Sequence, residues 1–560
     1  MSLRLKVLQG EGKRRTGFMA TISMGQAQNP LVLSLDVGSS SLRASLFDGA
    51  GHSLDGLEIK TTYQLDTTPD GGVEKDPDEL LGIAIDAIDQ LLAQAGPLAS
   101  RIEGVALDTF WHSLMGIDRE GHSTTPLLTW ADTRSAAVAR QLTREVDEHT
   151  LHSRVGVKIH PSYFPSKLRW LAAAQPTIFR RTRTWLSFGE YFYLKIFGRT
   201  LCSISMASGT GLFDQNKRDW DPEALALSGI TAEQLPSLGD TNTPFKGLLP
   251  EYALRWPVLA NIPWFLAVGD GAAGNLGSGC FSPDRIAVMV GTSGAMRVVY
   301  SGETVKIPWG LWCYHADYRR FVIGGALSEG GNLFAWMRQN FQLPSIEESE
   351  LALSRLEPDG HGLTVLPFLT GERSPGWNAS ARAAIVGLSL DTSPLEIMRA
   401  GLESIAYRFG ILHDIMADAL PQALQIIASG GALLNSPTWM QILADVLNRP
   451  VTASAEGETT SRGAALLALE QLGVFGPLPE VPVKVSGVGS ENATTLLEHK
   501  PAPVEVPVIQ RNVVQSGGLS FAHYGFGQTY QPNQARHARY TAAIERQKQL
   551  YNVLVRNNTV

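Results

Sequence analysis

Three glycine-rich turns, each directly after a short apolar run, are the first features of this sequence that could do chemistry. They are residues 36–41 (Asp-Val-Gly-Ser-Ser-Ser), 291–294 (Gly-Thr-Ser-Gly) and 429–432 (Ser-Gly-Gly-Ala). Glycine lets the backbone approach a ligand closely, and the hydroxyl and backbone N–H groups of such turns can hold phosphate oxygens. A carboxylate beside phosphates needs a cation between them, which makes Asp36 a candidate Mg²⁺ ligand.

A fourth stretch, residues 267–274, places a single carboxylate, Asp270, among small residues. Such surroundings admit a substrate, so Asp270 is a candidate general base. The structural alternative is an N-cap that opens a small-residue helix. The same stretch has GxGxxG spacing, but residues 286–300 contain no acid where a dinucleotide site would require one. The chain has no P-loop motif, and residues 291–295 lack the final glycine of a GxSxG hydrolase motif.

Short strands must hold these turns in place. Both the first and the second turn are flanked by apolar runs that predict a strand on either side. Arg43 and Arg297 follow the two turns at similar offsets. Two interpretations stay open: a pair of related domains that each open with the same hairpin, or chance recurrence of a common motif. The predicted strands are 31–36, 42–47, 286–290 and 295–300.

Elsewhere, helical and strand patterns alternate, which is typical of the α/β class. Asp76 before Pro77, and Thr392 or Ser393 before Pro394, predict helix N-termini. Residues 476–518 are rich in Pro, Val and Gly and predict a linker or surface excursion. The remaining predicted elements are helices at 77–93, 394–416, 437–447 and 534–555 and strands at 102–107 and 424–428.

Composition excludes several classes of protein. A net charge of −7 provides no broad basic surface for nucleic acid or an anionic membrane, and no apolar run is long enough to span a bilayer. The three cysteines are far apart and odd in number, which argues against a disulfide framework and favours a cytoplasmic protein. Residues 1–30 are basic with one acid, Glu11. We expect a disordered extension there; a targeting peptide, or a start site upstream of Met19 or Met24, is the alternative.

Seven motifs follow one another along the chain. They are residues 36–43; Trp130-Ala131-Asp132-Thr133-Arg134; Gly269-Asp270; Gly291-Thr292; Gly371-Glu372-Arg373-Ser374-Pro375 with Ala381-Arg382; Ala400-Gly401-Leu402-Glu403; and Gly430-Gly431-Ala432 with Asn435. In type and order they resemble the motifs of the FGGY carbohydrate kinases, within the actin-like ATPase superfamily. The resemblance runs from about Leu31 to Gly473 and returns between Tyr530 and Leu554. Ser39 stands where threonine is usual in the family, and Ala383 replaces a common glycine.

The resemblance implies an α/β fold of two actin-like (ribonuclease H-like) domains with an ATP cleft between them. The expected divisions are an extension at 1–30, a sugar-binding domain at 31–281, a nucleotide-binding domain at 282–475, and a linker and C-terminal helix at 476–560. Family members are often dimers, so a homodimer is an expectation by analogy.

The resemblance also implies roles for individual residues. Asp270 would be the catalytic base, and Asp36 together with Asp270 would hold Mg²⁺. Trp111, His112 and Tyr163 would contact the sugar, although core packing is the alternative for Trp111 and for the neighbouring Phe164. ATP would be contacted by Ser39, Ser40, Arg43, Gly291, Thr292, Gly331, Gly431 and Asn435.

Residues 109–114 and 129–132 are most similar to the gluconate kinases of the family. We therefore expect ATP-dependent phosphorylation of a small sugar or sugar acid, D-gluconate to 6-phosphogluconate before others. A substrate carboxylate needs a cationic or hydrogen-bond-donating partner, for which His112, Arg134 and Lys167 are candidates. Xylulose or another ketose or polyol is the alternative substrate. A catalytically inactive, sugar-binding regulator is the alternative from another class.

Overall fold

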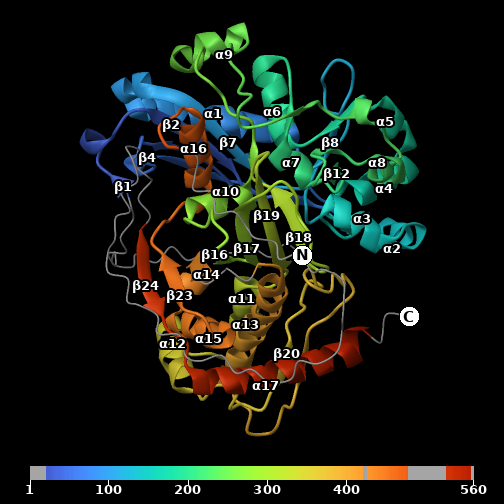
Figure 1. Cartoon of the computed structure of the whole chain (residues 1–560), viewed down its shortest axis with the longest axis vertical. Coiled ribbons are helices and arrows are strands. Elements are labelled where there is room, and N and C mark those ends of the chain that lie inside the picture. Colours follow the sequence, from blue (N-terminus) through green and yellow to red (C-terminus); the bar gives the residue numbers. More distant parts are fainter. Residues whose placement is uncertain (1–20, 421–424, 477–524, 557–560) are drawn as a thin grey trace, which may run out of the picture.

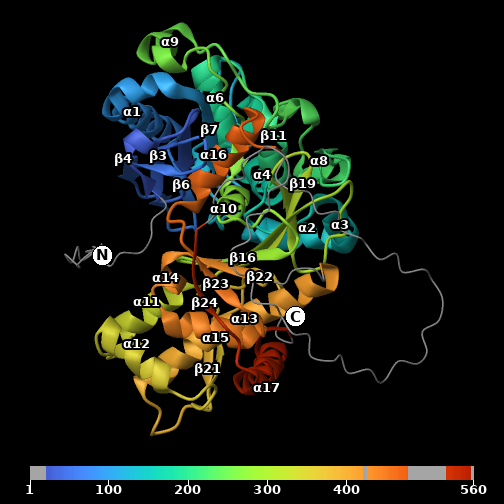
Figure 2. The same ribbon diagram turned by 60° about the vertical axis from the view of Figure 1, so that its left-hand side comes forward.

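Two separate β-sheets dominate a computed structural model that describes residues 21–420, 425–476 and 525–556. In Figure 1 the blue strands of one sheet lie in the upper half, while the other sheet runs from β18 and β19 in the middle to β23 and β24 in the lower half; Figure 2 shows β19 among the upper helices. A large buried apolar cluster packs against each sheet.

The N-terminal sheet has six strands. β2, β3 and β4 form an antiparallel meander, while β7 and β15 run parallel to β2 on its other side. In spatial order the strands are β1 (Thr21–Ile22), β4 (Ser53–Thr62), β3 (Ser41–Phe47), β2 (Leu31–Val37), β7 (Ile102–Thr109) and β15 (Val268–Gly269).

The C-terminal sheet has seven strands. β16, β17 and β19 form an antiparallel meander, and β22 and β23 run parallel to β16. In spatial order the strands are β18 (Trp312–His315), β19 (Arg320–Leu327), β17 (Gly294–Ser301), β16 (Arg285–Val290), β22 (Gln425–Ser429), β23 (Val451–Ser454) and β24 (Phe526–Tyr530).

The two sheets repeat one plan. Strands β2, β3, β4, β7 and β15 have the same order and relative direction as β16, β17, β19, β22 and β23. The repeated hairpin in the sequence therefore belongs to a repeated unit rather than to a chance recurrence. Two such units in one α/β chain are the predicted actin-like architecture.

Helices connect the strands and cover the sheets. Asp76 caps α1 (Pro77–Ala95) by accepting hydrogen bonds from the N–H groups of Asp78 and Glu79, and Ser393 caps α13 (Pro394–Ala419) with a capping box to Glu396. Both predicted N-termini are therefore confirmed. The other helices are α2 (Ala136–Glu145), α3 (Glu148–Val155), α4 (Phe164–Ala174), α5 (Pro176–Arg181), α6 (Phe188–Phe197), α7 (Ile204–Ser208), α8 (Pro222–Ser228), α9 (Pro250–Arg255), α10 (Asp270–Gly277), α11 (Gly331–Asn340), α12 (Ile346–Arg355), α14 (Gly431–Leu434), α15 (Pro437–Leu447), α16 (Thr459–Gln471) and α17 (Gln534–Tyr551).

Short strand pairs lie between the main elements. They are β5 (Asp66–Thr67), β6 (Val73–Lys75) and β9 (Leu127–Leu128); β8 (Met115–Ile117) with β10 (Thr184–Leu186); β11 (Cys202–Ser203) with β14 (Leu238–Gly239); β12 (Phe213–Asp214) with β13 (Asp219–Trp220); and β20 (Thr364–Leu366) with β21 (Ala384–Val386).

Two segments pack against elements that are distant from them in the sequence. Helix α16 follows the C-terminal sheet but packs on β2, β7 and α10, and Figure 1 shows it in orange among the blue strands. After residues 477–524, which fall outside the described residues, β24 pairs with β23 and α17 packs on α13 and α15. The linker expected at 476–518 falls almost entirely within that range.

The disorder expected for the whole of residues 1–30 is wrong for its last third. Strand β1 pairs in parallel with β4, at Thr21 with Ser53 and Ile22 with Leu54. The Arg101 guanidinium also donates a hydrogen bond to the Ala27 carbonyl oxygen at 2.6 Å. Residues 1–20 lie outside the described part of the chain.

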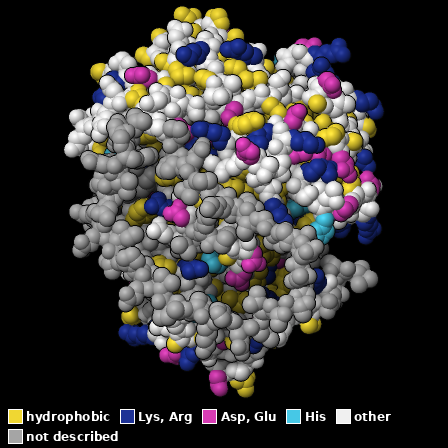
Figure 3. All heavy atoms as spheres, in the orientation of Figure 1, with side chains coloured by type: hydrophobic (Ala, Val, Ile, Leu, Met, Phe, Trp, Pro, Cys, Tyr) yellow, Lys and Arg dark blue, Asp and Glu magenta, His cyan; other side chains and the backbone are white. Residues whose placement is uncertain are grey.

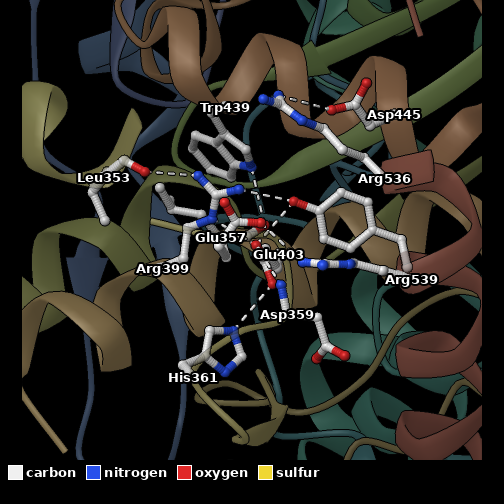
Figure 4. A network of polar contacts seen from close by, with 12 residues as sticks. Leu353, Glu357, Asp359, His361, Arg399, Glu403, Trp439, Asp445, Arg536 and Arg539 are labelled. Atoms are coloured by element: carbon white, nitrogen blue, oxygen red, sulfur yellow. Dashed lines mark hydrogen bonds and ion pairs between the residues drawn. The ribbon is translucent and has the colours of Figure 1, made fainter. Parts of the chain in front are cut away.

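A buried polar network holds α17 against α13 (Figure 4). Glu403 accepts hydrogen bonds from the Arg399 Nε at 2.6 Å, the Tyr540 hydroxyl at 2.9 Å and the Tyr407 hydroxyl at 3.0 Å. His361 Nε2 lies 3.1 Å from the same carboxylate. Burial alone would raise the pKa of Glu403, but the hydrogen bonds and charges of His361 and Arg399 lower it by more. The net pKa is therefore lowered, and the carboxylate stays charged.

The network includes three residues that could together hold a metal ion, Asp359, His361 and Glu403. Their potential ligand atoms lie within 4.8 Å of one another, and no other such group occurs in the described part of the chain. Both Glu403 oxygens already accept protein hydrogen bonds, and Asp359 pairs with Arg546. These contacts account for the cluster as a packing element that fastens the C-terminal helix.

No described helix has the length and apolar character needed to cross a membrane. On the face shown in Figure 3, Lys and Arg side chains are interspersed with Asp and Glu, and no broad patch of one sign is visible.

The network predicts a stability change. Replacing Glu403→Gln leaves the buried Arg399 without its counter-charge, so we expect a loss of about 3–5 kcal/mol in the free energy of unfolding. The matched control is Glu357→Gln, which removes an exposed ion pair to Arg539 and should cost under about 1 kcal/mol. Urea denaturation followed by circular dichroism measures both. Equal midpoints for the two variants would contradict the role given to Glu403.

Candidate active site

Asp270 lies where β15 ends and α10 begins, and the indole of Trp111 packs against the glycines on both sides of it. A Cβ on Gly269 would overlap that indole, and one on Gly271 would lie 2.6 Å from its Cζ3 atom. The Asp270 carboxylate accepts hydrogen bonds from the backbone N–H groups of Gly271, at 2.7 Å, and Trp111. The N-cap alternative for Asp270 is wrong, because Gly269 is the N-cap and Asp270 is the first helical residue.

Two more carboxylates lie on the same edge of the N-terminal sheet. Asp36 on β2 and Asp108 on β7 are register partners, and both are buried. Asp36 pairs with Arg43 at 3.3 Å and accepts a hydrogen bond from the Ser461 hydroxyl at 3.4 Å. Burial raises the pKa of Asp36, and burial together with Asp36 and Asp270 raises the pKa of Asp108 well above its usual value.

Arg297 brings the C-terminal sheet to this edge. It lies on β17, and its Nε atom would be 3.2 Å from a Cβ on Gly271. Burial raises the pKa of Asp270, while the Arg297 charge opposes that rise. The carboxylate therefore sits where the two sheets meet, with a proton affinity higher than that of an exposed aspartate.

The second and third glycine turns meet each other at Gly331. Gly331 N–H donates to the Gly291 carbonyl oxygen at 2.8 Å, and Asn332 N–H donates to the Thr292 carbonyl oxygen at 3.0 Å. A Cβ on Gly331 would lie 2.6 Å from the Gly291 oxygen and 2.9 Å from the Ala432 Cβ. The N-terminus of the ten-residue helix α11 thus opens against the 291–294 turn, an arrangement suited to an anion. Thr292, Gly431 and Asn435 are exposed there.

An aromatic cluster continues from Trp111 to Tyr314 and Tyr163. The Trp111 ring lies 4.7 Å from the Tyr314 ring, and the Tyr163 and Tyr314 hydroxyls are 2.8 Å apart. Trp111 is 5% exposed and its Nε1 donates to the Ser205 carbonyl oxygen, while Phe164 is 3% exposed. Both residues therefore pack in the core, as the alternative held; Trp111 acts on the site through its backbone N–H and its position.

His112 has a fixed tautomer. Its Nδ1 lies 2.6 Å from the Gly209 carbonyl oxygen, which can only accept, so Nδ1 carries the proton and Nε2 is an acceptor. Burial, and to a lesser degree the Arg373 charge, lowers its pKa well below the usual value. His112 is consequently neutral and offers a substrate an acceptor, which rules it out as the cationic or donor group for a carboxylate.

The other two candidates for binding a substrate carboxylate, Lys167 and Arg134, already have protein partners. Lys167 is fully buried and donates to the carbonyl oxygens of His112, at 2.6 Å, and Thr129, at 2.7 Å; burial lowers its pKa to about 7. Arg134 pairs with Asp132 and Glu74. Arg43, expected to contact ATP, is likewise engaged by Asp36 and, at 3.1 Å, by Glu458.

The structure supplies two other guanidinium groups, Arg297 and Arg373. Neither forms an ion pair with any side chain in the described ranges, and the Nε of each is buried without a hydrogen-bond partner there. The sequence did indicate Arg297, because it follows the second glycine turn at an offset similar to that of Arg43 after the first. Arg373 lay within one of the motifs of the sequence. Asp108 directly followed the predicted strand 102–107, but only the pairing of β2 with β7 placed it beside Asp36.

Comparisons with known proteins agree with this arrangement. Residues 31–277 match the model of the N-terminal domain of the FGGY family of carbohydrate kinases, and residues 286–471 match that of its C-terminal domain. A gluconokinase of Bacillus subtilis (strain 168) is 28% identical over 453 residues, which cover 79% of this chain and 88% of that protein.

Two solved structures share the fold. A gluconate kinase from Lactobacillus acidophilus superposes with a TM-score of 0.79 at 24% identity, and a ligand-bound xylulose kinase from the same organism with 0.80 at 24%. Each comparison covers 94% of this chain and 98% of the other.

The contact between Trp111 and the glycines can be tested. Gly271→Ala forces a methyl group against the indole and the Arg297 side chain, so we expect a loss of about 1–3 kcal/mol in stability. Gly274→Ala, in the same helix, meets nothing closer than 3.6 Å and should be neutral or stabilising by up to about 1 kcal/mol. Urea midpoints compare the two variants. A Gly271→Ala protein as stable as Gly274→Ala would mean that the indole is not seated as described.

Proposed function

The chain belongs to the FGGY family of carbohydrate kinases, and we propose that it transfers the terminal phosphate of ATP to D-gluconate, giving 6-phosphogluconate, with Asp270 as general base. The observation that carries the catalytic part is the position of Asp270, which lies where the N-terminal sheet meets Arg297 of the C-terminal sheet and close enough to Asp36, in the first glycine turn, for the two charges to interact.

In this proposal Asp270 accepts the proton of the attacking hydroxyl while the hydroxyl oxygen bonds to phosphorus and the bond to ADP breaks. A raised pKa suits the task, since a base with an ordinary aspartate pKa would hold the proton poorly at neutral pH. Two backbone N–H groups orient the carboxylate, and Arg297 keeps it from taking a proton too early.

Residues around the turns suit the co-substrate and a cation. Thr292, Gly331, Gly431 and Asn435 would line the nucleotide, with Ser39 and Ser40 beside its phosphates. Mg²⁺ supplies charge neutralisation in such reactions, and the oxygen donors of Asp36 and Asp270 are the kind it prefers. The buried Asp108, whose carboxylate oxygens find no hydrogen-bond partner among the described residues, fits the same role.

Two observations support an acid substrate over a ketose or polyol. Arg297 and Arg373 lie near the cluster of Trp111, Tyr163 and Tyr314 with no protein carboxylate paired to them in the described chain. The Arg297 charge is balanced by Asp270, but a neutral sugar would leave the Arg373 charge uncompensated, whereas an aldonate brings its own anion. Similarity to a gluconokinase points the same way. We place the boundary between the sugar-binding and nucleotide-binding domains at residues 281 and 282.

A substrate panel tests the proposal. Coupled ADP release with gluconate, xylulose and glycerol should give the highest kcat/KM for gluconate, by roughly tenfold or more. A higher value for xylulose would favour the ketose alternative. No turnover with any compound would favour a sugar-binding regulator.

The base has its own test. Asp270→Asn keeps the shape of the side chain but cannot take a proton, so we expect kcat with gluconate to fall about 10²–10⁴-fold while ATP affinity changes little. Asp418→Asn, an exposed position on α13, is the control and should retain full activity. Near-normal turnover in purified Asp270→Asn enzyme would refute the role.

A further inference from the structure

Resting on the proposed function, we infer that Arg373 and His160 form the subsite for the substrate's carboxylate, at the end of the aromatic cluster where His160 and Trp377 pack against Tyr163. The acid would then lie with its carboxylate at Arg373 and its most distant hydroxyl at Asp270. Arg373 sets specificity, while Arg297 serves the reacting end.

Arg373 belongs to a loop that is held in place by contacts with helices α13 and α17. Its neighbour Glu372 pairs with Arg408 of α13 and accepts a hydrogen bond from the Tyr551 hydroxyl of α17 at 2.5 Å. The Arg373 guanidinium lies 5.6 Å from the centre of the Trp130 ring, a cation–π contact that orients it without neutralising it. The Arg373 guanidinium is thus held in place but has no anionic partner among the described residues. This arrangement is expected of an arginine that binds a ligand.

His160 adds a neutral ring. Its Nδ1 lies 3.2 Å from the Ser162 backbone nitrogen and 3.0 Å from the Ser162 hydroxyl, so Nδ1 is engaged within the protein and Nε2 is the nitrogen left for a ligand. Burial and the nearby Arg373 charge lower the His160 pKa to about 3, which keeps the ring neutral at physiological pH. With its proton on Nε2, this ring would donate to a carboxylate beside the guanidinium without adding a second full charge.

The two arginines are not equivalent. Arg297 lies against Gly271, and its charge acts directly on Asp270. A substrate carboxylate at Arg297 would be forced next to the Asp270 carboxylate and would repel it. Arg373 acts instead on the pKa values of His112, His160, Tyr163 and Tyr314, all in the aromatic cluster. Only Arg373 can therefore bind the anion while leaving Asp270 free for a hydroxyl.

There is space at that end of the cluster. A cavity of about 760 Å³ is lined by His160, Pro161, Glu372, Pro375 and Trp377, so it borders the Arg373 loop on both sides of that residue. His160 and Trp377 stand edge to face at its wall, with ring centres 5.4 Å apart. The cavity therefore gives the acid group of a substrate room beside the Arg373 loop.

Equilibrium binding separates the subsite from the chemistry. The probes are gluconate and glucitol, which has the same carbon chain with a hydroxymethyl group in place of the carboxylate. Wild-type enzyme should bind gluconate more tightly, and Arg373→Met should weaken the gluconate Kd by roughly 10–100-fold. It should leave glucitol binding and the kcat at saturating gluconate within about threefold.

Further variants sharpen the result. Arg373→Lys keeps the charge but loses the planar fork, so it should restore part of the affinity. His160→Ala should weaken gluconate binding by several-fold. The matched control is Arg140→Gln, an exposed cation on the same cavity, which should change neither Kd.

Two outcomes would overturn the assignment in distinguishable ways. If Arg373→Met binds gluconate as wild type does and Arg297→Met does not, the carboxylate lies at the other end while the kinase assignment stands. If wild-type enzyme neither binds nor phosphorylates gluconate but phosphorylates a ketose, both the proposed substrate and the subsite fail. Unchanged glucitol binding verifies that each variant is folded.

Discussion

The packing of one indole against two glycines is the contact on which the rest of the candidate site depends. Trp111 occupies the space where side chains on Gly269 and Gly271 would be, and its backbone N–H binds the Asp270 carboxylate. The strand that ends at Gly269 and the segment after β7 are therefore fixed relative to each other. Arg297 of the C-terminal sheet lies against Gly271, so the packing of the indole on this glycine is also a point where the two halves of the molecule meet.

The electrostatics of the site follow from that meeting point. Asp36, Asp108 and Asp270 gather acidic charge at one edge of the N-terminal sheet, and burial raises the pKa of each. Arg43 compensates Asp36 from within that sheet, and Arg297 compensates Asp270 from the other. The balance is incomplete on both sides: Asp108 lacks a hydrogen-bond partner and Arg373 lacks an anion in the described chain. A cation, phosphates and an acid substrate would each supply what the protein leaves out.

Contacts at long range extend this organisation to the C-terminal segments. Helix α16 returns to the N-terminal sheet, where Ser461 binds Asp36, so the end of the family-matched region helps to hold the first carboxylate. Helix α17 is bound to α13 through Glu403, and its last residue, Tyr551, supports the loop that carries Arg373. The distant helix is thus part of the support for the proposed carboxylate subsite.

The sequence by itself determined the elements that depend on local chemistry. Asp76 before Pro77 and Ser393 before Pro394 specify helix starts, and the repeated turns and motif order predicted two actin-like units with Asp270 between them. It did not determine which charges are available, because the partners of Lys167, and the Glu74 and Glu458 carboxylates that complete the pairing of Arg134 and Arg43, are brought in only by tertiary packing. The tertiary structure alone decided that Asp108 lies beside Asp36 and that Arg297 and Arg373 approach the substrate side. The physical reason is that a charged group is free or satisfied according to its neighbours in space, and those neighbours come from segments dozens to hundreds of residues away.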